Sequence, residues 1–138
     1  MARDIFHNIV KEALIKDGWT ITHDPLRLLK REEGGLETDL GAEKLIVAEK
    51  GLTKIAVEVK SFQNPSPIND FHTAFGQYQT YIDVLEMIEI DRTMYLAMPY
   101  TVYQHLAQKA YFRYIAEKHH IKFILFVPKE KKIKTWIE

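Results

Sequence analysis

The stretch KIAVEVKSF, residues 54–62, decides the expected fold. Branched aliphatic residues occupy every second position, and Ala56, Glu58 and Lys60 stand between them. Because successive side chains of a β-strand point to opposite faces, this alternation predicts a strand with Glu58 and Lys60 side by side on one face. We therefore expect a carboxylate and an ammonium group next to each other on a sheet.

The segments around this strand predict an α/β domain. Residues 45–48 form a second apolar strand, and Lys50-Gly51 is expected to turn the two strands into a hairpin. Ser66 and Pro67 are residue types favoured at the N-cap and the first position of a helix, and a long apolar stripe at helical spacing follows them. A strand followed by a long helix is therefore expected.

Apolar periodicity predicts the other elements. Strands and helices alternate along the chain, so we expect one domain, residues 1–138, with a mixed sheet and helices on both faces. The remaining expected elements are a helix over 4–16 with Asp4 as N-cap and Gly18 as its stop, a strand over 19–23, a strand over 93–98, one continuous helix from Pro99 to Ile115, a buried strand over 121–127 and an edge strand over 131–137.

The composition fits an ordinary globular domain. Apolar residues make up 46% of the 138 residues and charged residues 28%, close to the average of soluble proteins. The absence of cysteine excludes disulfides and thiolate metal sites. No apolar run approaches the ~20 residues of a membrane span, and the N-terminus lacks the hydrophobic region of a signal peptide. We expect a cytoplasmic protein that makes no contact with a membrane.

Charge is balanced overall but uneven along the chain. The formal net charge is zero, which argues against a protein that coats nucleic acid by bulk attraction. The stretch 117–134 nevertheless holds six lysines and only two glutamates. A local phosphate contact and a solvated hairpin are both open interpretations, and the second is the more common one for such a run.

Asp39, Glu58 and Lys60 together suit phosphodiester hydrolysis. Mg²⁺ prefers oxygen ligands, which Asp39, Glu58 and the backbone carbonyl of Val59 could supply, with Mn²⁺ as the alternative ion. Such a cation polarises a phosphoryl oxygen and lowers the pKa of a bound water, while Lys60 can orient that water and stabilise charge on the phosphate. The competing interpretation is an exposed ion pair on an edge strand, which stabilises a protein little.

The predicted hairpin leaves Asp39 distant from this pair. A simple register about Gly51 places Ala42 opposite Lys60. Asp39 then lies three residues beyond, about 10 Å away at strand spacing. We expect a bulge or bend near Gly41 to bring the carboxylate back, because glycine marks such kinks.

The pattern of these residues resembles the PD-(D/E)XK nuclease superfamily. Asp39 followed by EVK at residues 58–60 is similar to its metal-site motif. QYQTY at residues 77–81 is similar to the Q-x-x-x-Y motif of the branch that resembles the RecB nuclease domain. The resemblance implies a restriction-endonuclease-like mixed sheet flanked by helices, with Mg²⁺-dependent cleavage of DNA.

The same resemblance implies roles for three further side chains. Glu12, on the first helix, would add to the catalytic and metal site, and Gln77 and Tyr81 would border the nucleic acid. Each has an alternative interpretation from its position alone. Glu12 flanks an apolar stripe, where charged residues are usually just exposed, and Gln77 and Tyr81 could be packed and hydrogen-bonded for structural reasons.

Four longer segments of the chain carry a more specific resemblance. They are ARDIFH at 2–7, DGWTITHDPL at 17–26, DLGAEKLI at 39–46 and IAVEVKSF at 55–62. These segments resemble the XisH family, the cyanobacterial factors that control excision of the fdxN element during heterocyst development. The resemblance implies DNA as a partner, a role beside a site-specific recombinase and a companion protein, XisI; a homodimer is also open.

Two other functional hypotheses stay open from the sequence. In the first, the chain is a non-catalytic regulatory subunit that keeps the nuclease fold and assists a recombinase through a XisI-like partner. In the second, it is a plain structural domain in which Glu58 and Lys60 are an exposed pair.

Overall fold

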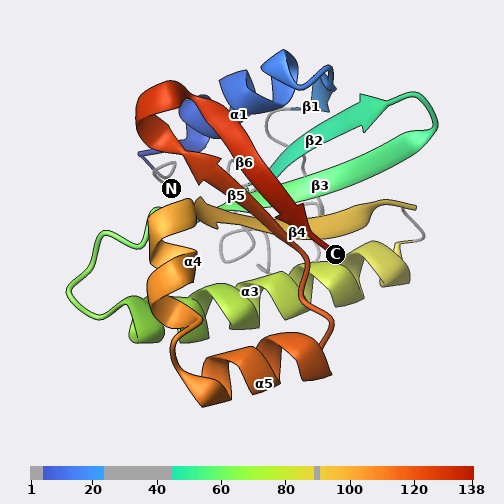
Figure 1. The fold of residues 1–138 in the computed structure, drawn as a ribbon. Coiled ribbons are helices and arrows are strands. Elements are labelled where there is room, and N and C mark those ends of the chain that lie inside the picture. The colour runs from blue at the N-terminus through green and yellow to red at the C-terminus, as the bar shows by residue number, and fades with distance from the viewer. Residues whose placement is uncertain (1–4, 24–44, 89–90) are drawn as a thin grey trace.

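The computed structural model describes residues 5–23, 45–88 and 91–138, and these residues form a six-stranded sheet with helices on both faces (Figure 1). Within these three ranges, every helix is too short or too polar to span a lipid bilayer. The described elements, in chain order, are α1 His7–Lys16, β1 Thr20–His23, β2 Leu45–Lys50, β3 Thr53–Val59, α3 Pro67–Met87, β4 Thr93–Pro99, α4 Tyr100–Leu106, α5 Ala110–Lys118, β5 Phe123–Val127, the 3-10 helix η2 Pro128–Glu130 and β6 Lys132–Ile137.

The sheet is mixed, as the sequence predicts. Its strand order equals the chain order, from β1 to β6. β3, β4 and β5 are parallel neighbours, whereas the pairs β1–β2, β2–β3 and β5–β6 are antiparallel. The carboxyl ends of the three parallel strands therefore meet at one end of the sheet, on the left in Figure 1. α3 provides the crossover that the parallel pair β3–β4 needs.

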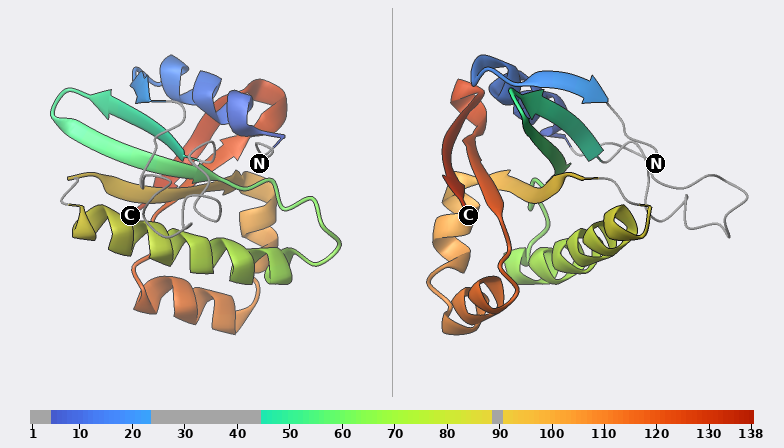
Figure 2. Two further views of the ribbon diagram at one scale, coloured as in Figure 1. Left: turned by 180° about the vertical axis from the view of Figure 1, so that it is seen from behind. Right: turned by 90° about the vertical axis from the view of Figure 1, so that its right-hand side faces the viewer.

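The sheet separates two apolar cores. One core, which includes Phe71, Leu96 and Phe112, lies beneath α3, α4 and α5, and we call this face the α3 side. The other, which includes Val10 and Val57, lies beneath α1, and we call this face the α1 side. Figure 2 shows the helices on either side of the sheet. The prediction of helices on both faces is therefore confirmed.

The β2–β3 hairpin differs by one residue from the expected register. Lys50 pairs with Thr53, so Gly51 and Leu52 form a two-residue turn. Gly51 has a φ of +61°, a conformation that glycine adopts without steric strain and that two-residue hairpin turns require. The expected register was centred on Gly51 alone, and it is wrong by one position because the turn contains two residues.

The predicted continuous helix after Pro99 is two helices. α4 ends at Leu106 and α5 begins at Ala110. Leu106 and Phe112 are both at most 1% exposed and lie in the core of the α3 side. In one continuous helix, six positions would place these two side chains about 120° apart on the surface. The break lets both side chains enter the same core, and it leaves Tyr111, which the continuous helix would bury, 49% exposed.

The helix boundaries are otherwise close to those expected. The Ser66 hydroxyl accepts a hydrogen bond from the N–H of Asn69 at 3.3 Å, which confirms the predicted cap of α3. Gly18 follows α1 with a φ of +92°, which confirms it as the stop. α1 begins at His7 with Phe6 in the N-cap position, so the prediction of Asp4 as its N-cap is wrong, and Asp4 itself lies outside the described residues.

Tyr78 joins α3 to the amino ends of β4 and β5. Its hydroxyl donates to the carbonyl of Met94 at 3.2 Å and accepts from the N–H of Lys122 at 3.1 Å. Its side chain is 2% exposed, and burial raises the pKa of Tyr78, although the hydrogen bond from Lys122 opposes this shift. The hydroxyl is therefore held in its neutral form at neutral pH, as a link between helix and sheet.

Tyr78→Phe should destabilise the protein by about 1–3 kcal/mol, because two backbone groups lose their hydrogen-bond partner. Urea denaturation would measure the free energy of unfolding. Tyr114→Phe makes the same chemical change at a position that is 66% exposed, and it should shift that free energy by less than about 0.5 kcal/mol. Similar losses in the two variants would contradict the role assigned to Tyr78.

Candidate functional site

Glu58 is a charged residue buried in the middle of the sheet. It lies on β3, between β2 and β4, and only 1% of its surface is exposed. Its partner on β4, Leu96, belongs to the core on the α3 side, so Glu58 points to that side too. Val57 and Val59 lie in the opposite core, which confirms the predicted alternation. The interpretation of Glu58 as an exposed residue on an edge strand is therefore wrong.

Lys60 follows β3 at its carboxyl end. Its N–H donates to the carbonyl of Ala97 at 2.9 Å, which continues the pairing with β4 past the end of the strand. Its side chain is half-buried. Because it comes two residues after Glu58, it lies on the same face of the sheet. Strand alternation thus puts the Glu58 and Lys60 side chains on one face, at the carboxyl end of a parallel strand.

The backbone carbonyl of Val59 points away from β4. The N–H of Lys60 points toward β4, and backbone groups of adjacent residues in a strand point to opposite sides, so the carbonyl of Val59 points to the β2 side. The described ladder between β2 and β3 ends at the pair Leu45–Glu58. This carbonyl therefore lies beyond the last described pair of the β2–β3 ladder and faces the β2 side. Asp39 precedes β2 in the sequence.

The backbone is strained two residues after Lys60. Phe62 has a φ of +61°, which is an outlier for a bulky residue and typically costs about 1–3 kcal/mol. Its side chain is only 7% exposed and belongs to the core on the α3 side. Burial of the ring offsets the strain and fixes the turn that leads out of β3. Nothing in the sequence pattern indicated this conformation, since phenylalanine has no preference for it.

Gln77 and Tyr81 lie one turn apart on α3, on the flank turned away from α5. The other flank carries Phe75, whose ring centroid lies 5.0 Å from that of His119 at the end of α5. Tyr81 has no exposed surface, so a contact with nucleic acid would require this side chain to leave the core. The Oε1 atom of Gln77 is buried and has no hydrogen-bond partner among the described residues. Such an atom is suited to accept from water or a bound group.

The structure does not bring Glu12 to Glu58. Glu12 lies on α1, whose buried residues belong to the core on the α1 side, and its carboxylate is 3.7 Å from the ammonium group of Lys131. Asp39 and Gly41 lie outside the described residues. Within the described ranges, no three histidine, aspartate or glutamate side chains gather closely enough to hold a metal ion. Of the predicted metal ligands, Glu58 and Val59 therefore lie within the described residues and Asp39 does not.

Comparison with known proteins identifies the family. A profile described as XisH protein matches residues 1–134. The chain belongs to the XisH family. A solved fdxN element excision controlling factor protein from Anabaena variabilis is 42% identical, with a TM-score of 0.83 and coverage of 96% of this chain and 98% of that one. A solved XisH family protein from Nostoc punctiforme is 39% identical, with a TM-score of 0.84 and coverage of 98% and 100%. No curated protein matches the chain.

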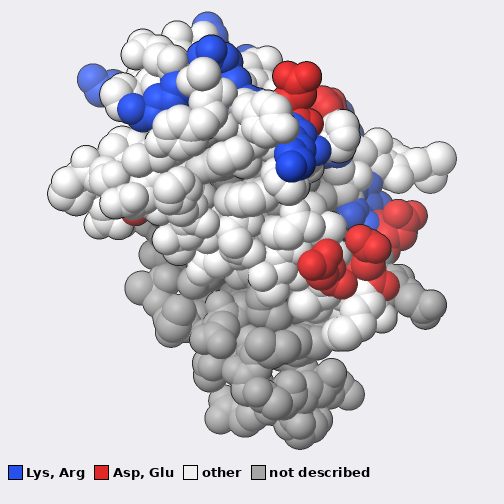
Figure 3. All heavy atoms as spheres, turned by 90° about the horizontal axis from the view of Figure 1, so that it is seen from below, with Lys and Arg blue, Asp and Glu red and all other residues white. Residues whose placement is uncertain are grey.

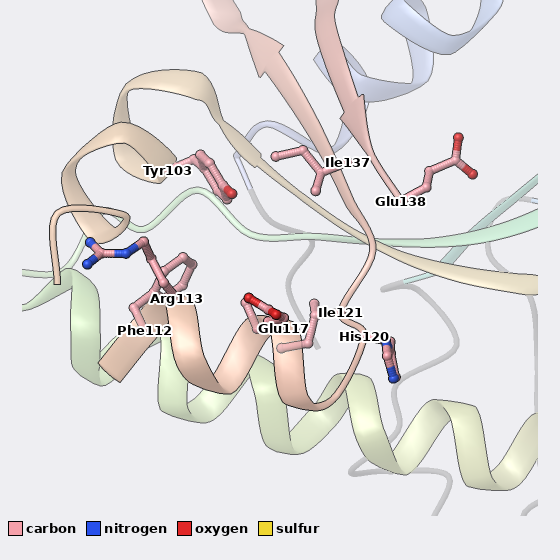
Figure 4. A pocket seen from close by; sticks show the side chains of 9 residues that line it. Tyr103, Phe112, Arg113, Glu117, His120, Ile121, Ile137 and Glu138 are labelled. Atoms are coloured by element: carbon pink, nitrogen blue, oxygen red, sulfur yellow. The ribbon is translucent and has the colours of Figure 1, made fainter. Parts of the chain in front are cut away.

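The XisH-family chain also has a pocket of about 370 Å³ between α5 and the end of β6 (Figure 4). It lies at the amino end of β5, opposite the end that carries Glu58. Figure 4 shows the Arg113 guanidinium turned away from Glu117, and Arg113 donates to the carbonyl of Ala107. Glu138, on the other wall, accepts from the hydroxyl of Tyr95 at 2.6 Å. The charged groups of the pocket do not converge on one point, so the pocket is not a candidate catalytic site.

The burial of Glu58 makes metal binding by the XisH-family chain testable. We expect calorimetric titration with Mg²⁺ to give heat with the wild type and none with Glu58→Gln, which keeps the shape of the side chain but removes its charge. Glu86→Gln is the matched control, because it makes the same change at an exposed position of α3. Thermal unfolding without metal would establish that both variants fold. Equal heats from wild type and Glu58→Gln would rule out a metal site at Glu58.

Proposed function

We propose that this XisH-family chain is a magnesium-dependent phosphodiesterase that acts on DNA, with Glu58 and Lys60 at its centre. The observation that carries the proposal is the 1% exposure of Glu58 on a central strand, with Lys60 on the same face at the carboxyl end of that strand. Acidic residues are rarely buried in the interior of a sheet for stability alone. A buried carboxylate beside a basic group is more typical of a functional site.

We further infer that the fold is restriction-endonuclease-like. Three features support this assignment: the β2–β3 hairpin that carries Glu58, the α3 crossover to the parallel strand β4, and the position of α1 on the opposite face. This is the arrangement that the resemblance to the PD-(D/E)XK nucleases leads us to expect.

The donor atoms on and beside β3 fit a hard divalent cation. The carboxylate of Glu58 and the carbonyl of Val59 offer oxygen, which Mg²⁺ prefers and Mn²⁺ also accepts. Asp39 would complete the set, and Oε1 of Gln77 is a further buried oxygen on the helix that covers the α3 side. A bound Mg²⁺ would supply the positive charge that activates water and polarises the phosphodiester.

The residues of the chain have separate roles in this proposal. Glu58 and Asp39 would hold the cation, and Lys60 would stabilise the negative charge that builds on the phosphate in the transition state. In the reaction, the oxygen of water bonds to phosphorus and the water gives up one proton to solvent. The bond from phosphorus to one ester oxygen breaks, and that oxygen takes up a proton. The surrounding apolar core lowers the local dielectric, which strengthens the interaction of Lys60 with this charge.

The relatives indicate the process in which such an activity would act. The protein from Anabaena variabilis is described as an fdxN element excision controlling factor. We infer that this chain also serves excision of a DNA element, beside a site-specific recombinase and a XisI-like partner.

A non-catalytic regulatory subunit is the second candidate function. The formal net charge of zero and the complete burial of Tyr81 favour it, because a nuclease that holds DNA through Tyr81 needs that side chain at the surface. In this function the chain assists the recombinase through its XisI-like partner and cleaves nothing.

Lys60→Ala separates the two functions. If the chain is a nuclease, the wild type should cleave DNA in the presence of Mg²⁺, and Lys60→Ala should lower the rate by about a hundredfold or more. Gel assays on duplex, branched and single-stranded DNA would measure this rate. Lys54→Ala is the matched control, because Lys54 is exposed at the amino end of the same strand, and it should cleave like the wild type.

Excision of the element in cells provides a second measurement for the same variants. A nuclease requires that Lys60→Ala abolish excision. If Lys60→Ala excises normally and the wild type cleaves no form of DNA, the regulatory function replaces the catalytic one.

A further inference from the structure

The zero net charge of the chain hides a strong separation of charge. Residues 109–138 hold eight lysines and arginines but three acidic residues, whereas residues 1–108 hold eleven basic and sixteen acidic residues. Figure 3 shows the molecule from below relative to Figure 1. In this view, the largest group of basic side chains lies on the upper left and most of the acidic side chains lie on the right. Such an asymmetry favours an anionic partner for the C-terminal region.

The positive charge is densest on the turn between β5 and β6. Residues 129–134 contain four lysines and Glu130. Lys132 lies 3.2 Å from Glu130, but both side chains are more than half exposed, at 61% and 57%. An exposed ion pair of this kind is weak, so a phosphate can take the place of the carboxylate.

A β-bulge directs Lys134 toward the end of β4. Leu125 pairs with Thr135 and Phe126 with Ile133, so Lys134 is the extra residue of the bulge. Its ammonium group lies 5.6 Å from the centroid of the Tyr100 ring, a cation–π distance. This contact joins β6 to the residue that directly follows β4, near the carboxyl end of β5.

The bulge borders a hollow of about 410 Å³. Its walls come from the start of α4, the end of β5 and the first half of β6. The residues that line it are Tyr100, Val127, Glu130, Lys132, Ile133 and Lys134.

This hollow lies at the same end of the sheet as Glu58 and Lys60. β3, β4 and β5 are parallel and adjacent, so the end of β5 is two strand spacings, about 10 Å, from the end of β3. Phosphates of one strand are spaced about 3.4 Å along the helix axis and farther apart along the backbone itself, so this separation corresponds to at most about three nucleotides. One backbone could therefore reach both places.

We propose that Lys132 and Lys134, with Tyr100, form a phosphate-binding subsite that holds the DNA backbone within about three nucleotides of the site at Glu58. The DNA as ligand rests on the proposed function, whereas the subsite rests on the bulge, the hollow and the local excess of lysine. Glu130 occupies the place of the phosphate when no DNA is bound.

The test is DNA binding in EDTA, so that no cleavage takes place. Fluorescence anisotropy of a labelled duplex would give the dissociation constant over a range of salt concentrations. The double change Lys132→Ala and Lys134→Ala should weaken binding about tenfold or more and reduce the slope of log K against log salt by about 1.8, or 0.9 for each lost phosphate contact. The weakening should be alike for unrelated sequences, because phosphate contacts carry no sequence information.

Two further variants make the test local. Lys54→Ala with Lys118→Ala removes the same charge from exposed lysines near the amino ends of β3 and β5, and it should change the dissociation constant less than twofold. Glu130→Gln removes the competing carboxylate and should tighten binding. This opposite sign cannot come from a variant that merely fails to fold, and circular dichroism melts would confirm that all variants are folded.

Each remaining outcome is decisive. Equal weakening by the two double variants would overturn the subsite, because only the overall field would matter. Unchanged binding by the Lys132 and Lys134 variant would also overturn it, while the metal site at Glu58 could still stand through calorimetry and cleavage. Failure of the wild type to bind any DNA would overturn the subsite and the proposed nuclease function together.

Discussion

The structure depends on the position of β3 between two hydrogen-bonded neighbours. β3 pairs with β2 on one side and with β4 on the other, and cores cover both of its faces. Every residue from Ile55 to Val59 is therefore buried, Glu58 included. Removing a carboxylate from water carries a penalty of several kcal/mol, which an apolar residue of similar size would avoid. The burial of a glutamate at this position is the observation on which the proposed metal site rests.

Local features of the sequence predicted the elements that depend on local interactions. The alternation in residues 54–62 identified β3 and the face of Glu58, and Ser66 with Pro67 identified the start of α3. Both patterns act through neighbours in the chain, by the pleat of a strand and by the capping of the first helical turn. The family followed from the same kind of evidence, because its motifs are short and continuous.

Features that depend on distant contacts were missed. The break between α4 and α5 exists because Leu106 and Phe112 must both enter one core. The apolar spacing within residues 99–115 does not show which of these side chains share a core. The hairpin register was wrong because residues 45–48 are apolar at every position, so the apolar pattern fits a turn of one residue and a turn of two residues equally well. Of the candidate site, the sequence predicted that Glu58 and Lys60 share a face, but not that Glu12 lies across the sheet and pairs with Lys131.

Departures from regular geometry point to the carboxyl end of the parallel strands. The described non-glycine residues with positive φ are Phe62, His120 and Lys131. His120 directly follows the C-cap of α5 and Lys131 is the C-cap of η2, positions where helix ends adopt this conformation. Phe62 ends no helix, so its strain is explained instead by the turn that it fixes beside Lys60.

The bulge at Lys134 lies at the same end of the sheet and is a second departure from regular backbone geometry. A regular β5–β6 ladder would keep Lys134 in the alternation of the strand, whereas the bulge carries it to the Tyr100 ring. Local rules of backbone geometry are broken in natural proteins mainly where function requires it. Two such breaks, at Phe62 after β3 and at the bulge near the end of β5, flank the carboxyl end of β4, the end of the sheet at which the proposed metal site and the proposed phosphate subsite lie.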